Sequence, residues 1–154
     1  MIDLDDVDRR ILAILRERPR TPVAEIARLA SVARGTAQAR IDRLERTGVV
    51  TGYGPDLDAE AIGFGVSAFV TLEITQGQDH AVVEHLATVP EVLEVHAVTG
   101  PGDLLCRVVA RSNAHLDEVI QEMLAAPGAG RTVTQLALNT RLRRAVIDLV
   151  IARA

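Results

Sequence analysis

A segment of about thirty residues, 22–53, constrains the fold most, because its apolar spacing predicts two short helices joined by a tight turn. About four residues, 30–33, remain for the turn, which is the spacing of a helix-turn-helix. Gly48 ends the second helix as a C-terminal capping glycine does. Residues 49–53 then predict a strand, so the expected domain is a winged helix-turn-helix with the motif itself at about 22–41.

The second predicted helix, which begins near Arg34, has two unlike faces. At 100° per residue, Ala37, Ile41 and Leu44 form its apolar stripe. The opposite face is small, polar and basic, a profile that lets a helix lie deep in a groove of duplex DNA. An ordinary solvated face is the alternative. We expect DNA contacts from Arg34, Gly35, Thr36, Gln38, Ala39, Arg40 and Arg43.

These seven residues have different expected roles. The three arginines bind phosphates, or guanine edges if they reach the groove floor. Thr36 and Gln38 read bases or methyl groups, while Ala39 allows close approach.

Charge is distributed unevenly along the chain, although its formal net charge is −4. Residues 1–54 carry a balance of +2, and residues 55–154 a balance of −6. All 17 cations are arginine, and several gather near the turn and the second helix. This local basic density favours a nucleic-acid partner at that place. A biased genomic base composition equally explains the choice of arginine over lysine.

A first helix is expected over about 6–17, capped by Asp5 with Asp8 three residues later. Its apolar stripe makes it a scaffold for the next two helices. Glycine, proline and aspartate then give the segment GPDLDAEAIG the composition of a linker. The expected organisation is a DNA-binding domain over 1–53, a linker over 54–63 and a second domain over 64–154.

The second domain has the order strand, helix, strand, strand, helix, strand. This order is that of a ferredoxin-like βαββαβ sandwich with both helices on one side of the sheet, which makes the fold class α+β. Phe69, Leu105 and Val109 are expected on the other side. The tail over 141–154 has helical spacing but can equally add a strand at a sheet edge. The predicted elements are strands at 64–74, 92–99, 103–111 and 132–138, with helices at 79–88 and about 113–126.

Short motifs run through both domains in a fixed order. They are Leu4-Asp5, Asp8-Arg9-Arg10-Ile11-Leu12, Glu25-Ile26-Ala27, Arg40-Ile41, Arg43-Leu44-Glu45, Gly48-Val49-Val50, Gly52-Tyr53, Leu57-Asp58 with Gly63, Pro90-Glu91-Val92, and Thr99-Gly100 with Asp103-Leu104-Leu105. Each alone is weak, but in this order and spacing they are specific. By these motifs the chain resembles the Lrp/AsnC (leucine-responsive and asparagine-synthesis regulator) family of bacterial and archaeal transcription regulators over nearly all of its length.

One position departs from the family pattern. The family usually has serine, often followed by proline, at the start of the recognition helix, where this chain has Ala33 and Arg34. Alanine caps a helix less well than serine by about 1 kcal/mol. Either Arg34 offsets this on a phosphate, or Ser31 caps from further back.

The resemblance implies a sequence-specific regulator that binds promoter DNA and responds to an amino acid or related metabolite. It also implies that the second domain, the regulation-of-amino-acid-metabolism (RAM) domain, pairs sheet to sheet in a homodimer, with dimers assembling further to octamers. The implied effector pocket lies beside the loop Gly100, Pro101, Gly102 and Asp103, with Thr134 and Gln135 contributed by a facing subunit.

The loop has two interpretations. Asp103 can hold the ammonium of a free amino acid, while N–H groups freed by the glycines hold its carboxylate. Alternatively, the loop is only a hairpin turn whose aspartate fixes the backbone.

Signs of catalysis are weak, so no enzyme activity, cofactor or metal is expected. His80 and His85 are five residues apart, which turns them to different sides of a helix. The single cysteine, Cys106, alternates with core residues, which favours a packed thiol, and it permits no internal disulfide. No glycine-rich phosphate loop is present in the sequence.

Two other functions fit the same two-domain frame. One is an architectural protein that coats DNA without gene-specific control. The other is an enzyme like the tetrapyrrole decarboxylases, which the net acidic second half disfavours because such substrates carry several carboxylates. With no long apolar run and no basic leader, we expect no membrane span or secretion signal, and a cytoplasmic, nucleoid-associated protein.

Overall fold

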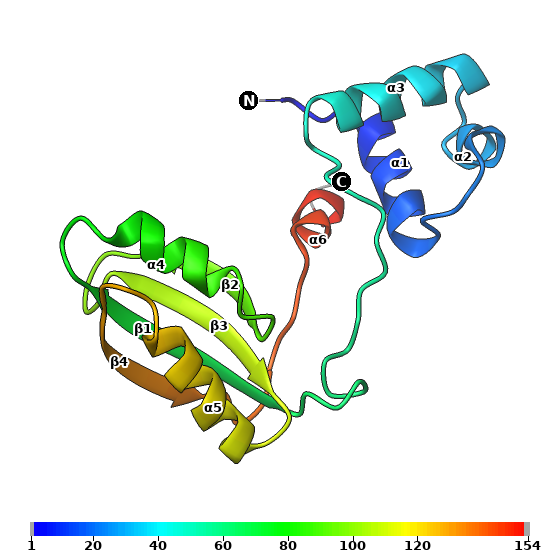
Figure 1. Ribbon diagram of the computed structural model, residues 1–154. Helices are drawn as coiled ribbons and strands as arrows, with labels where there is room; N and C mark the ends of the chain where they lie inside the picture. Colours follow the sequence, from blue (N-terminus) through cyan, green and yellow to red (C-terminus); the bar gives the residue numbers. More distant parts are fainter. Residues whose placement is uncertain (1, 153–154) are drawn as a thin grey trace. The chain divides into compact units, whose positions relative to one another are not determined.

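The computed structural model describes residues 2–152, which form two compact units (Figure 1). The first unit contains the residues up to Pro55 together with those from Leu142 onward, and the second contains 56–141. Between residues 2 and 152, no helix combines the length and apolar character that a membrane span needs.

The first unit is a helix-turn-helix on a scaffold helix, as predicted. Its helices are α1 (Asp6–Glu17), α2 (Val23–Leu29) and α3 (Arg34–Arg46). The expected cap of α1 is confirmed, because the Asp8 N–H donates to Asp5 Oδ1 at 3.0 Å and the Asp5 N–H donates to Asp8 Oδ2 at 3.1 Å. The apolar core joins all three helices through Ile11, Leu12, Leu15, Ile26, Ala30, Ile41 and Leu44.

The turn between α2 and α3 depends on one left-handed residue. Ser31 has φ 56°, and the Val32 N–H then donates to the Ala27 carbonyl at 2.9 Å. Ala33 occupies the N-cap of α3 without a side-chain hydrogen bond. Helix α3 therefore begins at Arg34, and Ser31 serves the turn rather than the cap.

The strand predicted over 49–53 does not form, so the unit has no wing of the expected kind. The N–H groups of Val49 and Val50 both donate to the Leu44 carbonyl, at 2.9 and 3.0 Å. Gly48, with φ 71°, allows this reversal. The chain folds back on the end of α3, and the N–H groups of Val49 and Val50 bond there rather than to a strand.

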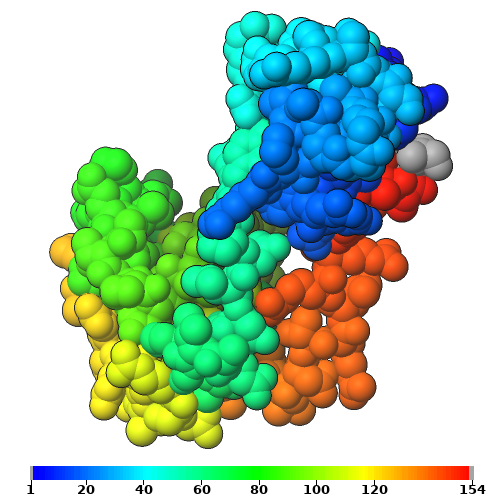
Figure 2. All heavy atoms as spheres, turned by 90° about the vertical axis from the view of Figure 1, so that its right-hand side faces the viewer, coloured from blue at the N-terminus to red at the C-terminus, as the bar shows by residue number. Residues whose placement is uncertain are grey.

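The C-terminal tail was assigned to the wrong domain. It forms α6 (Val146–Ile151), whose Ile147 and Val150 pack on the core of the first unit. Figure 2 shows the red tail against the blue α1. A 3.7 Å ion pair between Arg16 and Asp148 joins the same two helices. The tail is thus helical and belongs with the helix-turn-helix, because apolar partners are found there; residues 153–154 of the expected tail lie outside the described residues.

The second unit has the predicted ferredoxin-like topology. Its sheet is antiparallel with the order β2-β3-β1-β4, and α4 and α5 cover one face (Figure 1). The last strand begins three residues earlier than predicted, where Ala129 pairs with Ile74. The elements are β1 (Val66–Ile74), α4 (Asp79–Leu86), β2 (Val92–Ala97), β3 (Leu104–Ala110), α5 (Asn113–Leu124) and β4 (Ala129–Leu136).

Alternation along β1 and β3 separates the two faces of the sheet. Ala68, Val70 and Leu72 are fully buried under the helices together with Cys106, and burial raises the pKa of its thiol to about 11. Phe69 is on the opposite side and 39% exposed. The register Thr71↔Leu105 and Ser67↔Val109 places Leu105 and Val109 on the side away from the helices, as predicted, although Val109 is only 6% exposed.

Candidate DNA-binding surface and effector loop

The outward face of α3 contains the small and polar side chains that were predicted to lie there. Ala37, Ile41 and Leu44 are buried and fix the helix on the core. With 13 residues, α3 is about 20 Å long. The residues exposed on it include Arg34, Gly35, Thr36, Gln38 and Ala39.

One exposed carboxylate on this face was missed. The Gln38 side-chain amide donates to Asp42 Oδ1 at 2.7 Å, one turn further along α3. A carboxylate repels phosphates but accepts from the amino group of cytosine. The i, i+4 spacing of Gln38 and Asp42 is the signal that could have found this pair.

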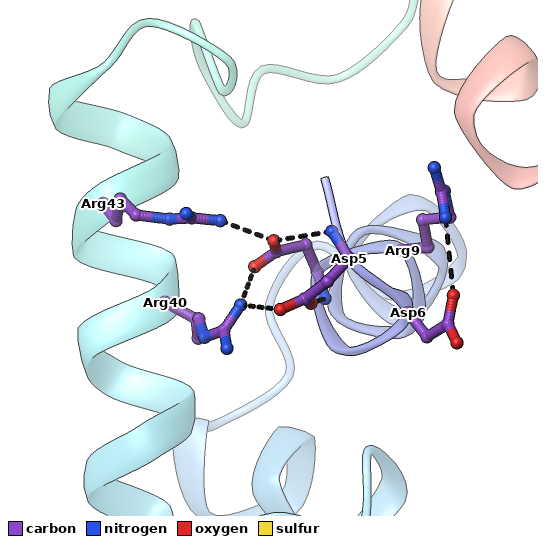
Figure 3. Close-up of polar contacts among 6 residues, drawn as sticks. Asp5, Asp6, Arg9, Arg40 and Arg43 are labelled. Atoms are coloured by element: carbon purple, nitrogen blue, oxygen red, sulfur yellow. Dashed lines mark hydrogen bonds and ion pairs between the residues drawn. The ribbon is translucent and has the colours of Figure 1, made fainter. Parts of the chain in front are cut away.

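Arg40 and Arg43 turn toward α1 and bind two acidic residues (Figure 3). Arg43 Nη2 donates to Asp8 Oδ2 at 2.5 Å, and Arg40 Nη1 donates to Asp8 Oδ1 at 3.1 Å. Arg40 Nη1 also forms a short ion pair with Asp5. We call these four residues the α1–α3 clamp. Their charges cancel, so the two arginines add no net positive charge to the surface.

Asp8 is the buried member of the clamp, with its side chain fully inaccessible to solvent. It lies on the apolar stripe of α1 with Ile11, Leu12 and Leu15. A buried carboxylate is stable only when it is paired and hydrogen-bonded. Two guanidinium groups and the Asp5 N–H meet this requirement. In a sequence, a carboxylate on an apolar helix stripe indicates that a neighbouring helix supplies a cation to pair with it. The pairing of Asp8 with arginines of α3 could have been predicted from this pattern but was not.

The pKa of the Asp5 carboxyl is lowered from 3.8 to about 2, first by the hydrogen bond from the Asp8 N–H and then by Arg40. A folded pKa below the unfolded value means that this stabilisation is present above about pH 4 and is lost between about pH 4 and pH 2. Asp5→Asn keeps the cap but does not titrate. We therefore expect the difference in free energy of unfolding between wild type and Asp5→Asn to shrink over that range in urea titrations.

The exposed Asp3 supplies the matched control for this measurement. Asp3→Asn removes the same charge from the same segment but leaves the bonds of Asp5 with Asp8 and Arg40 in place. Equal pH dependence for the two variants would contradict the role of the Asp5 bonds.

Of the five arginines near the motif, three are paired. Arg28 binds Glu25 at 2.6 Å within α2, and the clamp holds Arg40 and Arg43. Over residues 2–152, Arg34 and Arg46 have no recorded ion pair. Uncompensated positive charge therefore lies at the two ends of α3.

The loop Gly100–Asp103 in the second unit is closed by its aspartate. Asp103 Oδ2 accepts the Ile74 N–H at 2.6 Å, and the Asp103 N–H donates to the Leu72 carbonyl at 2.9 Å. Gly100 and Gly102 have φ of 112° and 80°. Asp103 Oδ2 therefore fixes the backbone, as the hairpin interpretation expects. Asp103 Oδ1 makes no hydrogen bond within the described part of the chain.

Thr134 and Gln135 are not brought to one place. They are consecutive on the edge strand β4, where Thr134 pairs with Val70 and Gln135 with Phe69. Val70 faces the helices and Phe69 faces away, so the two side chains lie on opposite faces of the sheet. A single pocket on one face of β4 can take only one of them.

The histidines lie apart. His85 Nε2 is 2.8 Å from the Glu122 carbonyl, and His115 is 3.5 Å from Glu91. Within residues 2–152, no group of three or more histidine, cysteine, aspartate or glutamate side chains is arranged to hold a metal ion.

Comparison with known sequences identifies both units. Residues 4–45 match the AsnC-type helix-turn-helix domain, and residues 67–147 match the Lrp/AsnC ligand binding domain. The HTH-type transcriptional regulator AldR of Mycolicibacterium smegmatis is 33% identical over 80% of this chain and 74% of its own length.

Solved structures agree with the fold. AsnC of E. coli superposes with a TM-score of 0.87 at 26% identity, covering 95% of this chain and 99% of AsnC. The transcriptional regulator NMB0573 of Neisseria meningitidis, solved as a complex with L-Met, gives 0.82 at 24% identity and covers 92% and 94%. The second match concerns the fold alone.

Proposed function

Because the chain belongs to the Lrp/AsnC family of helix-turn-helix transcription regulators, we propose that the exposed face of α3 recognises promoter DNA. The observation that carries this proposal is the low, polar surface of Gly35, Thr36, Gln38 and Ala39 on a helix fixed to its core by the opposite stripe. In the major groove, Thr36 and Gln38 meet base edges, and Gly35 and Ala39 let the backbone approach. Such a protein works at the nucleoid, in the cytoplasm.

Phosphate contacts are assigned first to Arg34 and Arg46. Arg46 follows Arg34 by twelve residues along the α-helix, which is a rise of about 18 Å. This distance exceeds the roughly 12 Å width of the major groove. They can therefore reach phosphates on both sides of the groove. Arg40 and Arg43 also contact phosphates, but only with guanidinium nitrogens that the clamp leaves unused, which for Arg43 excludes the buried Nε.

The second unit is proposed to bind an amino acid or a closely related metabolite. The loop 100–103 offers Asp103 Oδ1 to an ammonium group, and the backbone at the exposed Gly100 leaves space for a carboxylate. The L-Met complex of the related fold is consistent with such a ligand. Thr134 and Gln135 lie on opposite faces of the sheet. Gln135 is on the same face as Phe69, away from the helices, and Thr134 is on the face that the helices cover.

We assign dimerisation to the uncovered face of the sheet. Phe69 and Val133 are 39% and 49% exposed there, and Leu105 lies beside them, whereas Val109 on the same side is already buried within the chain. A second copy covering this face would bury apolar area that the chain alone leaves in water. Assembly to octamers would bring effector loops of neighbouring dimers together.

The test is selection of duplexes from a random DNA library with the full-length protein, followed by binding and mass measurement with and without each amino acid. We expect enrichment of an imperfect palindrome, and one effector that changes its affinity or the assembly. Enrichment of no sequence would favour an architectural DNA-coating protein and refute the proposed regulator. No response to any amino acid would refute the effector assignment alone.

A further inference from the structure

We propose that Asp8 is a positioning residue for DNA recognition: from α1, it fixes the orientation of α3 and of the Arg40 and Arg43 side chains. This inference rests on the proposed function and adds a residue that does not itself face DNA. Figure 3 shows both arginines reaching across from α3 to the acidic end of α1.

The bonds of Asp8 and the neighbouring pair of Asp5 with Arg40 are directional, whereas the other contacts between α1 and α3 are apolar. Ile11, Ile41 and Leu44 hold α1 and α3 together, but apolar burial has no preferred angle. Asp8 accepts from two arginines one turn apart on α3, each on a different carboxylate oxygen. Two anchor points on one helix oppose both its rotation about its axis and its sliding along it. Charge-assisted bonds of this kind are the strong ones.

A second set of bonds holds the carboxylate itself. Asp8 Oδ2 accepts the Asp5 N–H at 3.1 Å, and the Asp8 N–H donates back to Asp5 Oδ1 at 3.0 Å. The N-terminal cap of α1 and the clamp are therefore one network. The start of α1 is ordered by the same atoms that orient α3.

The clamp stays closed when DNA binds. If Arg40 and Arg43 left Asp8 for a phosphate, a fully buried carboxylate would lose both of its cations. Each arginine is about one-third exposed, at 30% and 35%, so each can meet a phosphate while still bound to Asp8. A guanidinium held on one edge presents its remaining N–H groups in one direction, which fixes the register of α3 along the groove.

The experiment compares Asp8→Asn with Asp6→Asn. Both changes remove one negative charge from the first turn of α1, but Asp6 is 84% exposed and, among residues 2–152, binds only Arg9, at 3.4 Å. Figure 3 shows that this pair lies away from α3. Affinities of the full-length variants are measured for the selected duplex and for a scrambled duplex at constant salt, at a temperature where melting curves show each variant folded.

For Asp8→Asn we expect the ratio of selected to scrambled affinity to fall at least tenfold. Affinity for the scrambled duplex should rise slightly, and we expect the same small rise in Asp6→Asn. Asp6→Asn should keep the wild-type ratio. An unchanged ratio in Asp8→Asn would overturn the proposal. A gain in affinity for the selected duplex would also overturn it, since the clamp would then merely mask the arginines.

A second variant keeps the test decisive if Asp8→Asn does not fold. Arg43→Lys retains the positive charge opposite Asp8 but replaces the planar guanidinium with an ammonium group. The orientation of α3 should therefore be less well fixed, while the charge of the surface stays the same. The expected result is again a lower ratio, with the dependence of scrambled-duplex affinity on salt unchanged; a wild-type ratio would refute the inference. A wild-type protein that does not distinguish the two duplexes would instead refute the proposed function.

Discussion

Replacing Ala39 with glutamate is expected to weaken binding of the selected duplex at least about 100-fold, or about 2.7 kcal/mol. Ala39 lies on the exposed face of α3, where the proposed complex brings the helix backbone close to the groove floor. Glutamate adds bulk at that point and places a negative charge between two rows of phosphates. Since the site is exposed and glutamate is a good helix former, unit stability should change little. Titration of labelled duplex gives the affinity.

Ala114→Glu is the matched control. Ala114 is an exposed alanine in the first turn of α5, in the second unit, so the net charge changes equally. Its DNA affinity should stay within about twofold of wild type, or about 0.4 kcal/mol. If the two glutamates weakened binding equally, the effect would be one of overall charge and α3 would not be the recognition element.

Gly102→Ala is expected to reduce the free energy of unfolding of the second unit by about 3 kcal/mol, within the range for strained backbone combined with overpacking. Gly102 has φ 80°, and a Cβ there would overlap Cγ2 of Thr71 on β1. The neighbouring Asp103 binds Ile74 at the end of the same strand, so a shift of the loop also disturbs that bond. Chemical denaturation followed by circular dichroism measures the change.

Gly100→Ala separates the two causes. Gly100 also has a positive φ, 112°, but a Cβ there would meet no atom within 4 Å. Backbone strain alone should cost about 1–2 kcal/mol. Both substitutions lie in the proposed effector loop, so an effect on effector binding would not separate the two causes. The diagnostic result is which of the two variants has the lower free energy of unfolding. A Gly100 variant as unstable as the Gly102 variant would show that contact with Thr71 is unimportant.

Periodicity was enough to predict most of the elements. The stripe of Ala37, Ile41 and Leu44 located the core side of α3, and strict alternation from Val66 to Ile74 located β1 with its buried face. Both patterns are local, because each element buries one face whatever it packs against. The βαββαβ order then left few topologies to choose from, and the observed sheet has the expected one.

What could not be predicted depended on partners distant in sequence. Arg40 and Arg43 were assigned from their place on the helix, but their acceptors lie more than thirty residues away on α1. The predicted wing failed because the N–H groups of Val49 and Val50 donate to the Leu44 carbonyl, and the apolar tail was ambiguous until its partner, α1, was known. The contacts of α3 with DNA remain a prediction, as do the effector contacts of the loop.

The return of α6 to the helix-turn-helix makes the first unit discontinuous along the chain. Ile147 and Val150 join a core whose other members precede Pro55. During synthesis, these two side chains emerge only after residues 56–141 have left the ribosome, by which time the ferredoxin-like half has all of its strands. The first unit can therefore complete its packing against α1 only after the whole of the second unit has been synthesised.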